Sequence, residues 1–251
     1  MRTRSILLLV VLLLSLSACA PAAEEYGCSE LMTSFLDLHK GIGETPAHLQ
    51  VENPLEDGSE FNPNTYFNVL TSLSMEDGFT LDFAYTYDFM GGYPTLYARH
   101  ASWTPFLSQA DVRPGIDYFL DHVEVKDTPE GYLQYVILAV KSEQFYLFWH
   151  ANYNDTQIVC NRKALKEIVK GLEKTTFGIP ISVVEKTRAL DLEAIEPVIT
   201  FTDTTVTVQV TTFTMWGGFY HQTFTIDRSF PHHIIDFQEE QIAPYNCGIS
   251  F

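Results

Sequence analysis

The chain has 251 residues, of which 46% are hydrophobic, and its 32 Asp and Glu outnumber its 15 Lys and Arg to give a formal net charge of −17. This length and apolar content are enough to bury the core of one large domain or two small ones. Binding of nucleic acid relies on basic residues that neutralise phosphates, so the acidic excess excludes nucleic acid as a partner. Solubility is the simplest consequence of the same charge.

The first residues have the pattern of an export signal. Arg2 and Arg4 precede an unbroken run of Ile, Leu and Val over residues 6–14. That run is about half of the roughly 20 apolar residues that a helix needs to cross the hydrocarbon core. It therefore predicts a cleaved signal peptide over residues 1–18 rather than a membrane span.

The signal ends in Leu16-Ser17-Ala18-Cys19, which resembles the lipobox of bacterial lipoproteins. The resemblance covers this segment alone. It implies cleavage before Cys19, lipid transfer to the Cys19 thiol and acylation of the new amino terminus by a fatty acid such as palmitate. Two or more acyl chains hold a protein durably on a membrane, so Cys19 would suffice as the anchor, with residues 19–27 as the tether. The alternative is an ordinary signal peptide with a chance cysteine.

The same resemblance implies an extracytoplasmic protein of the cell envelope. Ala20 follows the anchor, where an Asp would suggest retention at the inner membrane of a double-membrane bacterium, so the outer membrane or cell surface is the expected site. Cleavage would leave 233 residues, and the loss of Arg2 and Arg4 would change the formal charge to −19.

Three further cysteines follow Cys19, namely Cys28, Cys160 and Cys247. An oxidising compartment would allow one disulfide among three pairings, and the sequence does not choose between them. No CxxC or Cys/His spacing indicates a zinc site.

Three segments have helical periodicity. The first covers about residues 28–40 and ends before Gly41-Ile42-Gly43. The second begins at Asn62-Pro63, with Asn as N-cap and Pro at the first helical position. In the third, Asn161 is the expected cap, and apolar residues fall on one face with lysines opposite.

A change to period two predicts strands after the second helix. In FTLDFAYTYDF, from Phe79, apolar and polar residues alternate, which predicts a strand with one solvated face. Gly91-Gly92 suits a two-residue hairpin turn, and this register would set Tyr85 opposite Ala98. Residues 133–140 and 145–149 are apolar on both faces, so we expect two central strands there.

The last third is rich in Val and Thr and predicts about four more strands. A three-residue turn at Gly217–Phe219 would set Val210 opposite Ile226. The expected fold is therefore α+β, with a mainly antiparallel sheet of hairpins and about three helices, in a single domain over residues 28–251. A helix followed by four strands occurs at 61–151 and again at 161–238, and an internal duplication is one interpretation of this order.

Few groups of residues have a spacing that suggests chemistry. Asp82 lies diagonal to Arg99 in the proposed hairpin, which predicts a cross-strand ion pair. His232 and His233 precede Asp236, but neighbouring strand residues point to opposite faces, so we expect no metal there. No familiar catalytic motif is present, and we expect no cofactor.

The stretch MWGGFYH, residues 215–221, places aromatic side chains at the tip of a hairpin. Exposed aromatic residues at such a tip commonly bind sugars, peptides or partner proteins. Trp216, Phe219, Tyr220 and His221 are therefore the predicted binding residues. The alternative is that Trp216 and Tyr220 fold over the end of the core.

These observations favour a non-enzymatic lipoprotein, held at the membrane through Cys19, that binds an unidentified small molecule, glycan or protein. One alternative is an extracytoplasmic hydrolase whose site is assembled only by the fold, from a pool of Asp82, Arg99, His221, His232 and His233. Another is a structural component of the envelope.

Overall fold

The larger sheet of the protein has five antiparallel strands. A computed structural model describes residues 27–88, 90–114, 116, 118–153 and 155–249. The strands are β5 (Gln157–Ile158), β6 (Val198–Phe201), β7 (Thr205–Thr214), β8 (Gly218–Asp227) and β9 (Ile234–Pro244). Their order is β5-β7-β8-β9, and β6 also pairs with β7. The signal segment, the lipobox and Cys19 lie outside the described residues.

Two smaller antiparallel sheets accompany the larger one. They pair β1 (Leu73–Met75) with β4 (Val123–Val125), and β2 (Phe79–Asp88) with β3 (Gly91–His100). The helices are α1 (Cys28–Ile42), α2 (Pro129–Lys141), α3 (Arg162–Leu172) and α4 (Val183–Leu190). Short 3-10 turns are η1 (Ala47–Leu49), η2 (Pro63–Asn68), η3 (Gln109–Asp111), η4 (Phe119–His122) and η5 (Trp149–Tyr153). The α+β fold with antiparallel sheets is thus confirmed.

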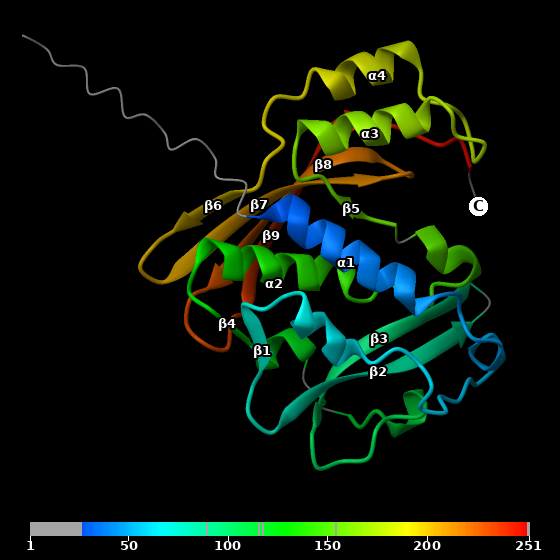
Figure 1. Ribbon diagram of the computed structural model, residues 1–251, viewed down its shortest axis with the longest axis vertical. Helices are drawn as coiled ribbons and strands as arrows, with labels where there is room; N and C mark the ends of the chain where they lie inside the picture. Colours follow the sequence, from blue (N-terminus) through cyan, green and yellow to red (C-terminus); the bar gives the residue numbers. More distant parts are fainter. Residues whose placement is uncertain (1–26, 89, 115, 117, 154, 250–251) are drawn as a thin grey trace, which may run out of the picture.

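Figure 1 shows how these elements are distributed along the molecule. Helices α1 and α2 cross the middle of the view, α3 and α4 lie at one end of the long axis, and the β2–β3 hairpin lies at the other. One large hydrophobic cluster joins α1, α2, β2, β3 and the larger sheet, and a second lies beneath α3 and α4. Among the described residues, no helix is long and apolar enough to cross a bilayer.

The prediction of two central strands over residues 133–140 and 145–149 was wrong. The first stretch belongs to α2, and every residue from Gly131 to Leu138 is buried. A helix covered on all sides is apolar all round, so its sequence resembles that of a buried strand. The start signal was present, because the Thr128 side chain accepts a hydrogen bond from Gly131 N and Pro129 occupies the first helical position.

The registers predicted for both Gly-Gly hairpins were wrong by four residues. Tyr85 pairs with Pro94, and Val210 pairs with Gln222. The glycines are needed for close contacts rather than for the turns. A Cβ on Gly92 would lie 2.4 Å from the Tyr85 hydroxyl, and one on Gly218 would lie 2.3 Å from the Ala243 carbonyl oxygen. Because the shift is an even number, every residue keeps its face of the sheet.

The helix predictions were confirmed in part. The first and third helices form, and Asn161 caps α3 by accepting a hydrogen bond from Ala164 N at 2.9 Å. Asn62 caps the second segment, but this is a short 3-10 helix that ends at Asn68. Helix α4 was missed, although Ser182 and Glu185 form a capping box that the sequence displays.

The two stretches considered as an internal duplication have different sheet topologies. Residues 61–151 contain two separate two-stranded sheets, whereas β6 to β9 belong to one continuous sheet. The structure therefore gives the duplication no support.

A disulfide joins Cys28, at the start of α1, to Cys160, just before α3, and leaves Cys247 free and buried. The bridge spans 132 residues. Closing so long a loop restricts the unfolded chain strongly, and a stabilisation of about 2–5 kcal/mol is typical.

We therefore expect Cys28→Ala to lower the free energy of unfolding by about 2–5 kcal/mol in denaturant titrations. The same titration with a thiol reductant should destabilise the wild-type chain and Cys247→Ala, but not Cys28→Ala. Equal sensitivity of all three proteins to the reductant would contradict the pairing.

Candidate functional site

A pocket of about 310 Å³ opens beside the β2–β3 hairpin, and we call it the Glu56 pocket. Its walls come from three parts of the chain: residues 56–64, the strand residues 80–83 with Arg99, and residues 105–107. The first wall is fixed by Asn64, whose side chain accepts a hydrogen bond from Leu81 N at 2.9 Å and donates one to Leu81 O at 2.7 Å. An amide that pairs with a strand backbone in this way holds its loop against the strand.

Asp82 and Arg99 hold the third wall in place. The Arg99 Nε group donates to Asp82 Oδ2, as the predicted ion pair requires, and its Nη1 group donates to the Trp103 carbonyl oxygen. Asp82 Oδ2 also accepts from Phe106 N at 3.2 Å. Residues 103–106 therefore lie across the hairpin, and the face of β2 expected to be solvated is covered, with Asp82 only 9% exposed.

Glu56 is the most perturbed acid of the pocket. Its residue is 8% exposed, and its Oε1 atom accepts a hydrogen bond from Tyr85 N at 3.1 Å. Burial raises the pKa of Glu56 to about 8, and the nearby charges of Glu60, Asp82 and Asp111 act in the same direction. The carboxyl group therefore carries a proton at neutral pH and can donate a hydrogen bond.

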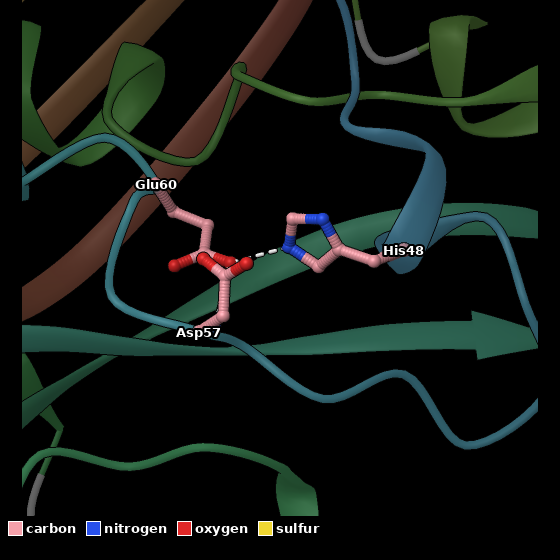
Figure 2. Close-up of side chains that lie close together, drawn as sticks. All are labelled: His48, Asp57 and Glu60. Atoms are coloured by element: carbon pink, nitrogen blue, oxygen red, sulfur yellow. Dashed lines mark hydrogen bonds and ion pairs between the residues drawn. The ribbon is translucent and has the colours of Figure 1, made fainter.

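The pKa of Glu60 is shifted in the opposite direction, so this side chain stays a carboxylate. Burial acts to raise its pKa, but hydrogen bonds from Asp57 N, the His48 ring and Gly58 N outweigh burial and keep the pKa below its ordinary value. The Asp57 N and Gly58 N bonds are 2.9 and 2.8 Å long. Figure 2 shows His48 approaching Glu60 from η1, with Nε2 at 2.5 Å from Glu60 Oε1.

His48, Asp57 and Glu60 also form a candidate cation site. One ligand atom from each lies within 4.8 Å of the others. The oxygens of Glu60 already accept bonds from two backbone N–H groups and the imidazole, and Asp57 Oδ1 accepts one from Ser59 N at 3.0 Å. A cation would have to replace the His48 contact. The present arrangement is that of a hydrogen-bonded loop closure, and we assign no metal to it.

The residues predicted to bind at the β7–β8 hairpin are mostly packed against the protein. Phe219 is 1% exposed and belongs to the core beneath α3, so it cannot take part in an exposed aromatic platform. Trp216 packs edge-on against Phe177, with ring centroids 6.5 Å apart. Tyr220 accepts a hydrogen bond from Gln241, and the His221 ring contacts the Ala194 carbonyl oxygen at 2.9 Å. A binding role for Trp216, Tyr220 and His221 stays a prediction.

The proposed hydrolase pool is brought together only in part. Asp82 and Arg99 line the Glu56 pocket, whereas His221, His232 and His233 do not. His232 is buried beside the Asp227 carbonyl oxygen at 3.1 Å, and His233 lies 3.2 Å from an Asp121 oxygen. Both rings therefore have structural partners.

Sequence reasoning missed the residues that matter most here, Glu56, Glu60 and His48. They lie in a loop rich in acidic and turn-forming residues, which has the composition of a solvated surface. Their proximity depends on where residues 103–107 fold, since Glu56 N donates to the Leu107 carbonyl oxygen at 2.8 Å. No local spacing could have indicated this contact.

The pKa of Glu56 predicts a pH-dependent stability. Between its ordinary value of 4.5 and about 8, the folded chain holds a proton that the unfolded chain has released. The contribution of Glu56 to the free energy of unfolding is therefore fully present below pH 4.5. It is lost as the pH rises through about 8, by up to about 1.4 kcal/mol per pH unit.

We expect Glu56→Gln, which cannot ionise, to gain stability relative to the wild type as the pH is raised from about 5 to about 8. Denaturant titrations across this range measure the difference. Glu52→Gln, which changes an exposed carboxylate nearby, is the matched control and should follow the wild-type profile. Parallel profiles for Glu56→Gln and the wild type would show that Glu56 is ionised in the folded chain.

Comparison with protein-family models, with curated proteins and with solved structures finds no match for this chain. The chemistry of the Glu56 pocket is therefore the basis for a functional proposal.

Proposed function

We propose that the chain is a lipid-anchored, extracytoplasmic binding protein, and that the Glu56 pocket takes a small, uncharged molecule with several hydroxyl groups, such as a sugar ring. The observation that carries this proposal is that one pocket holds two acids in opposite surroundings: Glu56 is buried, which raises its pKa to about 8, and Glu60 accepts hydrogen bonds that keep its pKa below its ordinary value. Protonated Glu56 can donate a hydrogen bond, and Glu60 Oε2, which receives Gly58 N at 2.8 Å, has a second lone pair that can accept one.

Hydroxyl groups suit such a pair because each can donate one hydrogen bond and accept others. Ligand pockets typically combine apolar walls with a few polar groups that fix orientation. Phe61, Phe83 and Leu107 supply apolar wall here and can contact the C–H face of a ring. The volume of about 310 Å³ lies at the small end of the range for ligand pockets, which fits a single ring.

The charge of the pocket argues against an anionic ligand. Glu60 and Asp82 are acidic, Arg99 is the one guanidinium in the wall, and Asp82 already engages it. The net charge of −17 adds to this repulsion at long range. A cationic ligand would instead favour the ionised form of Glu56, so its affinity would rise with pH, whereas a hydroxylated ligand loses a donor when Glu56 ionises.

We expect a mono- or disaccharide from a small panel to bind in calorimetric titrations, with an affinity that falls as the pH is raised above about 8. Glu56→Gln keeps a donor and should keep binding while losing the pH dependence. Glu56→Leu should weaken binding by about tenfold or more, because a ligand hydroxyl is then left unpaired. If no panel member binds, or if Glu56→Leu binds as the wild type does, the sugar-binding proposal is wrong.

Hydrolysis is the second candidate, favoured by the opposite pKa shifts of Glu56 and Glu60. A protonated acid beside a carboxylate is the division of roles that glycoside hydrolysis requires. Incubating the bound saccharide with the wild-type chain and with Glu56→Gln separates the two functions. Cleavage by the wild type alone would establish the enzyme, and an unchanged saccharide would leave a binding protein.

Two observations support the proposed location. The Leu16–Cys19 segment resembles a lipobox, and the Cys28–Cys160 disulfide is of a kind that persists in oxidising compartments outside the cytoplasm. Attachment through acyl chains on Cys19 would place the protein in the envelope without a spanning helix.

Cys19→Ser removes the thiol that would be acylated, so we expect the variant to leave the membrane fraction of cells that express it. Metabolic labelling with a palmitate analogue should mark the wild type and not the variant. Cys247→Ser is the matched control, because its thiol is buried and should be irrelevant to attachment. Equal labelling of Cys19→Ser and the wild type by the palmitate analogue would refute the anchor.

A further inference from the structure

The basic residues of this acidic chain are concentrated in one segment. Residues 162–188 contain seven of the 15 Lys and Arg of the whole sequence and only three acidic residues. The segment consists of α3, α4 and the loop between them. It is therefore locally positive, whereas the rest of the chain is strongly negative.

The lysines of α3 form a stripe that faces solvent. Leu165, Val169 and Leu172 are buried on the inner face of α3, over the second hydrophobic cluster. Spacings of three and four residues place Lys163, Lys166 and Lys170 on the opposite face of α3, and Lys174 follows just after the helix ends. All four lysines are exposed. None of the four makes an ion pair with a residue that the structure describes.

Exposed apolar side chains adjoin this stripe. Val183 is 80% exposed, and Val184, Phe177 and Ile179 are each more than half exposed. The Phe177 ring packs edge-on against Trp216. So many large apolar groups in a short segment indicate an interaction surface.

Helices α3 and α4 lie against each other in opposite directions. Lys186 Nζ lies 2.5 Å from Glu173 Oε1 at one end, and Arg162 donates to the Leu190 carbonyl oxygen at 2.6 Å at the other. Their outward sides therefore form one surface, which we call the α3–α4 face.

We propose that the α3–α4 face docks on the surface of an anionic lipid bilayer. A positive stripe beside exposed aliphatic and aromatic side chains matches the two layers that such a surface offers, negative headgroups and the acyl chains beneath them. Lysines attract the headgroups, and Val183, Val184 and Phe177 can enter the interface. A nucleic acid would leave the aliphatic residues unexplained.

The place where the chain enters the fold also favours a bilayer as the partner of the α3–α4 face. Cys28 is bonded to Cys160, and Asn161, the cap of α3, donates to Ser29 Oγ at 2.8 Å. The chain therefore enters the fold beside the start of α3. The tether of residues 19–27 can extend at most about 30 Å. This step rests on the proposed anchor, which would keep the α3–α4 face close to the bilayer.

Docking in this way would orient the Glu56 pocket. The α3–α4 end and the β2–β3 hairpin lie at opposite ends of the long axis in Figure 1. A bilayer against α3 and α4 would leave the pocket at the far end, open to soluble ligands.

Vesicle binding tests the proposal independently of the anchor. The full chain carrying Cys19→Ser is mixed with vesicles of phosphatidylcholine alone or with phosphatidylglycerol added. We expect preferential binding to the anionic vesicles that weakens with salt. Changing Lys163, Lys166 and Lys170 to Gln should weaken binding to anionic vesicles about a hundredfold, since each lysine near an anionic leaflet contributes about a fivefold factor.

The matched control changes Lys40 and Lys126 to Gln, and it should bind as the parent does, because both lysines lie outside the α3–α4 face. Amine labelling followed by mass spectrometry provides a second readout without substitution. Anionic vesicles should protect Lys163, Lys166 and Lys170 and leave Lys40 reactive.

Three results would overturn the proposal. One is equal binding of the triple variant and the control to anionic vesicles. Another is equal binding of the parent to both kinds of vesicle. The third is protection of the same lysines in the absence of vesicles at concentrations where the chain dimerises, which would assign the face to a second copy. If the palmitate analogue fails to label the wild type but the vesicle results hold, the anchor fails and the docking face stands.

Discussion

The Glu56 pocket depends on how the charge of Asp82 is satisfied. Asp82 lies in the middle of β2 on a face that the alternation of the sequence assigns to solvent. The fold instead covers it and compensates with Arg99 and with the N–H groups of Phe83 and Phe106. A buried carboxylate without such partners would cost several kcal/mol. The same contacts hold residues 103–107 over the hairpin, and that cover removes water from Glu56.

Burial and hydrogen bonding then give neighbouring acids opposite protonation states. Glu56 receives a single backbone hydrogen bond and loses solvent, so its neutral form is favoured. Glu60 receives donors at both oxygens, so its charged form is favoured. The two residues are four positions apart in one loop, and their difference arises entirely from what the fold places around them. Such divergence is more typical of functional sites than of surface loops.

The sequence was sufficient for features that depend on short spacings. Helix α3 with its Asn161 cap, a strand that begins at Phe79 and the ion pair of Asp82 with Arg99 were all confirmed. The ion pair was correct even though the register was not, because a shift by four residues keeps both side chains on one face.

Features that depend on distant contacts could not be predicted. Helix α2 is apolar on every side because every residue from Gly131 to Leu138 is buried, and periodicity cannot distinguish that case from a buried strand. Gly92 is glycine because the Tyr85 ring lies over it, which no turn rule conveys. The site was missed for the same reason, since Glu56 acquires its character from contacts with residues much later in the chain, such as Tyr85 and Leu107.

The protonation state of Glu56 in the folded chain tests this account most directly. Titrating the side-chain carboxyl carbon of Glu56 by NMR, with Glu56→Gln used for assignment, measures the pKa at that one group. We expect a midpoint near pH 8, with the resonance of a neutral acid at neutral pH. A midpoint near the ordinary value of 4.5 would mean that water reaches the carboxylate, and the proposed donor in the pocket would not exist.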